Sequence, residues 1–179
     1  MKSLRFFSIG ILLCLCALHA QAQNVAFKTN ALLWATTTTN IEAEVGLSNK
    51  SSLALMGAYN PWTFKGDKMM HTWAVQPEYK YWFCERFEGH FIGVHAHGAQ
   101  FFGGFHSKRY DGYLVGAGVS WGYDWILSRH WNIEAQIGFG INYTWYKESD
   151  RLPCYKCGID KDKTFFSPTK LAISLIYVL

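Results

Sequence analysis

Apolar and polar side chains alternate at every second position through most of the chain. In the segment 113–127 the odd positions are all aromatic or aliphatic, whereas the even positions are mostly glycine or polar. The segment 131–146 repeats the pattern, and Ser128-Arg129-His130 separates the two as a tight hairpin turn. Side chains on a β-strand point to opposite faces in turn, so each segment predicts a strand with one apolar and one polar face.

The same alternation predicts eight strands and no helix. Leu32-Leu33-Trp34 interrupts the alternation of the first segment, so that segment is ambiguous. The pattern therefore predicts an all-β fold, an eight-stranded antiparallel up-and-down transmembrane β-barrel. The predicted strands are 25–35, 39–48, 51–60, 72–83, 89–102, 110–127, 130–147 and 165–179.

The predicted connections also alternate in length. The turns near 48–50, 84–88 and 128–130 are short, whereas those near 61–71, 103–109 and 148–164 are longer. Only the Thr36–Thr38 link breaks this rule. Short turns at one end and longer loops at the other are typical of outer-membrane barrels, with the short turns in the periplasm.

The direction in which each face points separates two classes of barrel. A secreted lipocalin-like carrier turns its apolar face inward around a ligand, whereas a membrane barrel turns it outward. Five glycines lie on the polar face. Eight strands leave little interior room, so tiny residues fit an inward-facing polar side. These glycines are Gly116, Gly118, Gly122, Gly138 and Gly140.

Aromatic residues on the apolar face favour the membrane barrel. Trp131 and Tyr143 are 12 residues apart on one face, which is about 40 Å along a strand and about 30 Å after tilting. That span matches the hydrocarbon thickness of a bilayer. Cross-strand aromatic packing is the alternative interpretation. The predicted aromatic girdles contain Tyr113, Trp121, Tyr123, Trp125, Trp131, Tyr143 and Trp145.

The polar face carries charges of both signs, which must pair if they are buried. We expect them to form a polar plug inside the barrel, and a narrow conductance pathway is the alternative. The predicted network contains Lys28, Glu42, Glu44, Gln76, Glu78, Lys80, His95, His97, Asp124, Glu134, Gln136 and Lys170.

Two chemical sites are conceivable on this face. His95 and His97 point the same way and could bind a metal, but zinc sites require at least three protein ligands, and the sequence offers no obvious third beyond Glu78 or Glu134. A lipid-modifying barrel enzyme could combine His95 with Ser120 and Glu134. Because the sequence has no G-x-S-x-G motif, we expect no catalytic residues, no metal and no cofactor.

The first 22 residues are typical of a secretory signal peptide. Lys2 and Arg5 precede an apolar run, and Ala20-Gln21-Ala22 fits a cleavage site, which leaves residues 23–179 as one domain.

Cys154 and Cys157 form a C-x-x-C pair without the context of a zinc ribbon or a thioredoxin, so we expect a disulfide within the last long loop. Cys84 falls at the opposite end of the predicted barrel.

Composition narrows the function classes further. The chain is 50% hydrophobic and 17% charged, which is incompatible with disorder. Its 17 basic and 13 acidic residues give too small an excess to favour nucleic-acid binding. No segment after the predicted leader has the 18 or so consecutive apolar residues of a membrane-spanning helix.

Five segments and one cysteine pair carry a resemblance to known proteins: 25–30, 59–64, 76–82, 116–123 and 168–170, together with Cys154 and Cys157. They resemble a family of uncharacterised small outer-membrane proteins of Bacteroides-type Gram-negative bacteria. The resemblance implies an outer-membrane barrel but no activity. Some members carry a peptidoglycan-binding domain, which we do not expect in this chain, and some are encoded near fimbrial genes.

These observations together predict a structural or interaction role in the outer membrane. We expect a monomer surrounded by membrane lipid that presents the loops 60–72 and 148–164 to a surface protein, with fimbrial assembly suggested only by the resemblance. The alternatives are a lipid-modifying enzyme and a secreted lipocalin-like carrier.

Overall fold

The computed structural model describes residues 25–61, 63–64, 68–105, 108–150 and 159–179. The predicted signal peptide lies outside these residues, as do Cys154 and Cys157. The elements are β1 (Val25–Asn30), α2 (Ala31–Ala35), β2 (Thr39–Ser48), β3 (Ser51–Asn60), β4 (Thr63–Phe64), β5 (Lys68–Trp82), β6 (Gly89–Phe105), β7 (Lys108–Ile126), β8 (Trp131–Asp150) and β9 (Ile159–Val178).

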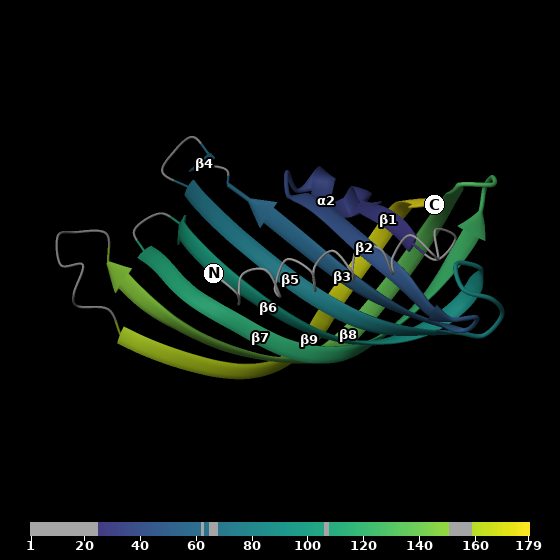
Figure 1. The fold of residues 1–179 in the computed structure, drawn as a ribbon. Coiled ribbons are helices and arrows are strands. Elements are labelled where there is room, and N and C mark those ends of the chain that lie inside the picture. Colours follow the sequence, from purple (N-terminus) through teal and green to yellow (C-terminus); the bar gives the residue numbers. More distant parts are fainter. Residues whose placement is uncertain (1–24, 62, 65–67, 106–107, 151–158) are drawn as a thin grey trace, which may run out of the picture.

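Eight of the strands form one antiparallel sheet arranged as a ring (Figure 1). Each strand pairs with the next along the chain, except that β3 passes over the two-residue β4 and pairs with β5. The pairing of β9 with β1 closes the ring. The predicted all-β fold with eight antiparallel strands is confirmed.

The strands are staggered around the ring. From Ala26 on β1, a path through directly paired residues on β2, β3, β5, β6, β7 and β8 arrives at Ser167 on β9. Ala26 itself pairs with Val178, which lies much farther along β9. Such a stagger requires the strands to tilt against the axis of the ring.

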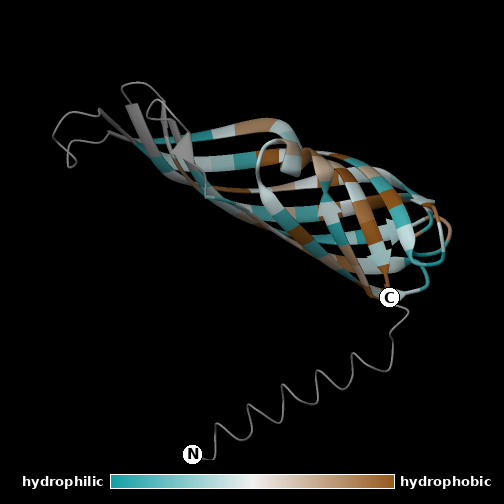
Figure 2. Ribbon diagram, turned by 90° about the horizontal axis from the view of Figure 1, so that it is seen from above, coloured by the Kyte–Doolittle hydropathy of each residue, from teal (hydrophilic) through white to brown (hydrophobic). Residues whose placement is uncertain are grey.

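Burial alternates along the strands and separates two chemically different faces. Figure 2 shows the corresponding alternation of hydrophobic and hydrophilic bands. Large apolar side chains point outward, including Val119, which is 62% exposed, Ile137 and Leu175. The buried positions inside the ring are mainly polar or charged. The distribution is the reverse of that in a water-soluble protein.

The first predicted strand, 25–35, is wrong in its second half. β1 ends at Asn30, and residues Ala31–Ala35 form the short helix α2. The Asn30 side chain accepts a hydrogen bond from the Leu32 backbone N–H at 3.0 Å, which caps the helix. The run Leu32-Leu33-Trp34 lacks strand alternation, which is consistent with this change. No helix among the described residues is long and apolar enough to cross a membrane.

The strands β5–β9 are longer than predicted. β5 begins at Lys68, β6 reaches Phe105, β8 extends to Asp150 and β9 begins at Ile159. The predicted connections 61–71, 103–109 and 148–164 are correspondingly shorter. The added segments, such as 68–71 and 148–150, do not alternate between apolar and polar residues, but their backbones continue the ladder through pairs such as Arg109 with Ser149.

Candidate functional site: the charged interior of the ring

Seven charged side chains meet inside the ring, and all are buried. Their positions follow from strand alternation, which directs every second side chain inward. They come from five strands: Lys28 on β1, Glu42 and Glu44 on β2, Glu78 and Lys80 on β5, Glu134 on β8, and Lys170 on β9.

Two lysines share two glutamates in the centre of this network. Nζ of Lys28 lies 2.6 Å from a carboxylate oxygen of Glu44 and 2.6 Å from one of Glu134. Nζ of Lys80 lies 3.2 Å from Glu44 and 3.0 Å from Glu134. Lys80 also lies over the ring of Phe91, with 4.5 Å from Nζ to the ring centroid. Each ammonium therefore faces at least two carboxylates, which compensates for its loss of water.

The third lysine connects opposite sides of the ring. Nζ of Lys170 on β9 lies 2.6 Å from Glu78 on β5 and 3.1 Å from Glu42 on β2. Glu134 likewise joins β8 to Lys28 on β1 and Lys80 on β5. These strands are not neighbours in the sheet. The ion pairs thus connect the walls of the ring across its interior.

Glu78 is also held by uncharged partners. Ser120 donates a short hydrogen bond to its Oε1, and Gln136 Nε2 donates to the same oxygen at 2.7 Å. Gln76 is buried nearby and donates to the Thr169 carbonyl at 3.5 Å. Glu78 therefore receives hydrogen bonds from β7 and β8 in addition to its contact with Lys170.

The two predicted histidines lie on the same inward face of β6 but have separate partners. His95 is buried and its Nε2 lies 2.8 Å from the Thr169 hydroxyl. His97 is half-buried, and its Nε2 lies 2.7 Å from Oδ1 of Asn142. Their ring centroids are 5.9 Å apart. Each imidazole is thus held by a polar side chain from another strand, β9 for His95 and β8 for His97.

Inward-facing glycines make room for these side chains. A Cβ added at Gly118 would lie 2.9 Å from Nε2 of His95, and one at Gly116 would lie 2.6 Å from Nε2 of His97. A Cβ at Gly93 would meet both Glu78 and Ser120 at 2.5 Å. Glycine on the polar face therefore relieves crowding in a narrow interior, as its position in the sequence suggested.

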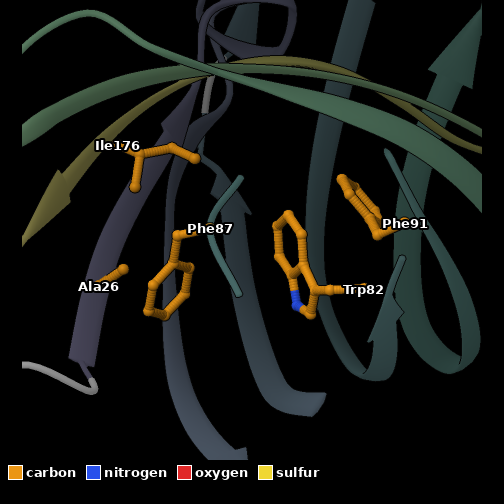
Figure 3. Packing of buried hydrophobic residues seen from close by; sticks show 5 residues of the cluster. All are labelled: Ala26, Trp82, Phe87, Phe91 and Ile176. Carbon is orange, nitrogen blue, oxygen red and sulfur yellow. The ribbon is translucent and has the colours of Figure 1, made fainter. Parts of the chain in front are cut away.

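An apolar cluster fills the interior at the end with the short turns (Figure 3). Trp82 packs against Phe91 at 4.6 Å and against Phe87 at 5.9 Å between ring centroids, and Ala26 and Ile176 complete the cluster. The Trp82 indole N–H donates to Ser52 at 2.8 Å, and Ser52 donates to Glu44 at 2.5 Å. The cluster therefore borders the ion-pair network directly.

The interior also contains a buried aspartate without an ion pair and a small cavity. Asp124 is buried and forms no ion pair with the described lysines. A cavity of about 100 Å³, enough for a few water molecules, lies between the charged network and α2. Lys170, Glu42 and Leu33 are among its lining residues.

The residues proposed for enzyme chemistry are not assembled. Ser120 bonds to Glu78, Glu134 bonds to two lysines, and His95 bonds to Thr169. No group of three or more histidine, cysteine, aspartate or glutamate side chains suited to a metal occurs in the described part of the chain. The closest approach of Glu78 to His95 is 3.9 Å, at Nδ1.

The predicted aromatic residues point outward or lie half-buried at the surface of the ring. Tyr113 stacks on Trp145 at 5.8 Å, and Tyr143 lies 5.6 Å from Trp145. At the other end, Trp131 contacts Tyr177 and Tyr123 contacts Trp125. Trp121 is also exposed and stacks on His90. Two separate aromatic groups therefore lie on the outer surface.

Cys84 lies in the connection between β5 and β6, where it is exposed and free. The predicted disulfide between Cys154 and Cys157 falls outside the described residues.

Sequence reasoning missed several interior residues. The sequence alternation did not single out Trp82 and Phe91, although Trp82 shares its parity with Glu78 and Lys80, and Phe91 shares its parity with His95. That parity could have identified both as inward-facing. Phe87 lies in a turn, where no periodic signal exists. The contributions of Ser52, Asn142 and Thr169 depend on the register between strands.

The comparisons with known proteins place the chain in a family but do not assign a function. A family model described as a protein of unknown function (DUF3575) matches residues 8–179, so the chain belongs to this family. No curated protein and no solved structure gives a match.

Proposed function

We propose that this protein is an outer-membrane β-barrel whose eight strands span the bilayer. The proposal rests on the placement of apolar and charged side chains, which is the reverse of that in a water-soluble protein. Val94, Val119 and Ile141 are each at least 61% exposed on the outside, while ionised groups fill the inside. A continuous apolar outer surface of this kind is far larger than the patches of soluble proteins, and acyl chains would cover it.

The ring form supports the same proposal. A bilayer offers no hydrogen bonds to the backbone, so a spanning sheet must close on itself. The pairing of β1 with β9 provides that closure. The two aromatic groups, around Tyr113 and Trp145 at one end and around Trp125 and Trp131 at the other, would lie at the two membrane interfaces.

The interior supports a structural role rather than transport, catalysis or ligand carriage. Trp82, Phe87 and Phe91 fill one end, and the ion pairs fill the region above them. A lipocalin-like carrier needs an apolar interior, and a lipid-modifying enzyme needs its nucleophile and base in contact. We therefore infer that the barrel is a rigid support that presents the parts of β5–β9 beyond the ring to partners outside the cell.

Cell fractionation tests this proposal. The full chain, expressed with its own leader in a Gram-negative host, should be recovered with the outer membrane and require detergent for extraction. The folded protein should migrate differently on gels with and without heating, as closed barrels do, and should not permit the entry of sugars into liposomes. Recovery as a soluble periplasmic protein would contradict the proposal.

A charged substitution on the outer face gives a sharper comparison. Val119→Arg should lower the yield of membrane-inserted protein, because a midplane arginine on the lipid face costs about 2–4 kcal/mol. Ser128→Arg, in the exposed turn between β7 and β8, is the matched control and should insert normally. Equal yields of the two variants would argue against lipid contact at Val119.

A further inference from the structure

The last strand, β9, extends well beyond the strand that closes the ring. β1 pairs with β9 only between Ser174 and Val178, whereas β8 pairs with it as far as Ile159. Among the residues that the structure describes, no strand pairs with the β1 side of β9 from Ile159 to Ile173. β9 is therefore the outermost strand of the projecting sheet on that side (Figure 1).

The part of this edge nearest the ring is covered in other ways. The Asn30 side chain donates to the Leu171 carbonyl at 3.0 Å and accepts from the Ile173 N–H at 3.3 Å, so it continues the ladder beyond β1. Pro168 has no N–H to leave unpaired. The opposite edge of the projecting sheet is covered by β4, which pairs with the start of β5. The segment Asp162–Ser167 has no such cover among the described residues.

The ladder pattern identifies the backbone groups that face outward. Val178 N–H donates to His130, so even-numbered positions at this end of β9 bond to β8. The register shift opposite Gly138 and Phe139 adds one residue to β9 and reverses the alternation. Beyond it, Thr164 and Phe166 direct their N–H and C=O groups away from β8.

We propose that the edge Asp162–Ser167 binds an extended segment of another protein, which adds a strand to the sheet beside β9. Main-chain hydrogen bonds to Thr164 and Phe166 would supply affinity in this recognition mode, and side chains would supply specificity. An exposed edge strand is a ready template for such pairing.

The side chains along the edge define the chemistry of the partner. Asp162 and Lys163 are exposed on opposite faces and form no ion pair among the described residues. Phe166 is 71% exposed and stacks on Phe139 at 6.2 Å. The segment that fits carries a basic residue opposite Asp162, an acidic residue opposite Lys163, and an apolar residue beside Phe166.

A second copy of this chain does not fit the edge Asp162–Ser167. This exclusion rests on the proposed membrane embedding. Two barrels in one membrane point the same way, so their β9 strands would run parallel. A parallel ladder needs a one-residue stagger between the strands, which a two-fold axis along the membrane normal forbids. The occupant is therefore a different polypeptide. It would begin beside Asp162, which pairs with Trp145 at the proposed membrane interface, and extend to Phe166, which pairs with Ile141 on the proposed lipid-facing surface.

Peptide binding to the full chain in detergent micelles tests the inference. The probe is a short fluorescent peptide of alternating threonine and valine, with lysine opposite Asp162 and glutamate opposite Lys163, measured by anisotropy. Thr164→Pro removes one outward N–H and should weaken binding about fivefold, the effect of one hydrogen bond. Thr164→Val keeps the N–H and should bind as the wild type does. Heat-dependent gel mobility confirms that each variant is folded.

Three results would each overturn the inference. A peptide N-methylated at its ladder-facing amides should not bind, and equal binding of this peptide would overturn the inference. Binding that Thr164→Pro leaves unchanged would also overturn it, and so would a concentration-dependent dimer that the same substitution abolishes. Because these assays use purified protein, their result is independent of where the protein is found in the cell.

Discussion

Buried charge dominates the energetics of single residues in this protein. A lysine or glutamate inside the ring is stable only because partners of opposite charge lie within hydrogen-bond distance. Glu134 contacts both Lys28 and Lys80, so its carboxylate supports two ammonium groups at once. Loss of one such partner leaves a buried charge without full compensation, which is far more costly than the loss of a surface ion pair.

Glu134→Gln should therefore destabilise the protein by about 3–5 kcal/mol. The measurement is the free energy of unfolding by urea in lipid vesicles or detergent. Glu85→Gln, at an exposed position in the connection between β5 and β6, should change stability by less than about 0.5 kcal/mol. Similar values for the two variants would show that Glu134 is solvated.

Two strand glycines provide a matched test of interior crowding. A Cβ at Gly140 would overlap the Ala117 carbonyl oxygen and the Gly118 backbone, whereas a Cβ at Gly98 meets nothing within 4 Å. Gly140→Ala should cost about 1–3 kcal/mol through overpacking. Gly98→Ala should be neutral or stabilising by up to about 1 kcal/mol. The same urea titration measures both, and a smaller loss for Gly140→Ala than for Gly98→Ala would contradict this packing.

At the scale of elements, Asn30 joins β1, α2 and β9. Its side chain caps the helix through Leu32 and replaces a missing strand beside Leu171 and Ile173. Without this residue, the edge of β9 would be uncovered where β1 ends.

Asn30→Ala should lower stability by about 1–2 kcal/mol through the loss of a cap and two further hydrogen bonds. Asn30→Asp keeps the oxygen acceptor but cannot donate to Leu171, so its loss should be smaller. Amide hydrogen exchange should show faster exchange at Ile173 in the alanine variant. Unchanged exchange at Ile173 would mean that Asn30 does not protect the edge.

Alternation in the sequence was sufficient to predict the strands β2 and β3 at their observed bounds and the number of strands in the ring. It failed at Ala31–Ala35, where helix formation depends on a cap, and at the ends of β5–β9, where the backbone ladder continues without an alternation of apolar and polar residues. The choice of partners inside the ring, such as Ser120 with Glu78, depends on the stagger between distant strands, which no local pattern encodes.

At the scale of the whole molecule, the proposed topology places the short turns in the periplasm. Cys84 lies at that end and is exposed. In a variant carrying Cys154→Ser and Cys157→Ser, a membrane-impermeant maleimide should leave Cys84 unlabelled in intact cells and label it after the outer membrane is permeabilised. Labelling of Cys84 in intact cells would show that the short turns face the outside of the cell.

The proposed membrane embedding requires that the outer face of the ring contacts acyl chains. A nitroxide attached at Val119→Cys in a cysteine-free background, with the protein reconstituted in lipid vesicles, measures this contact through its collision rates with oxygen and with a water-soluble nickel complex. A second label at Ser128→Cys marks the aqueous limit. If acyl chains cover this face, we expect high oxygen and low nickel accessibility at position 119. High nickel accessibility there, equal to that at position 128, would contradict lipid contact.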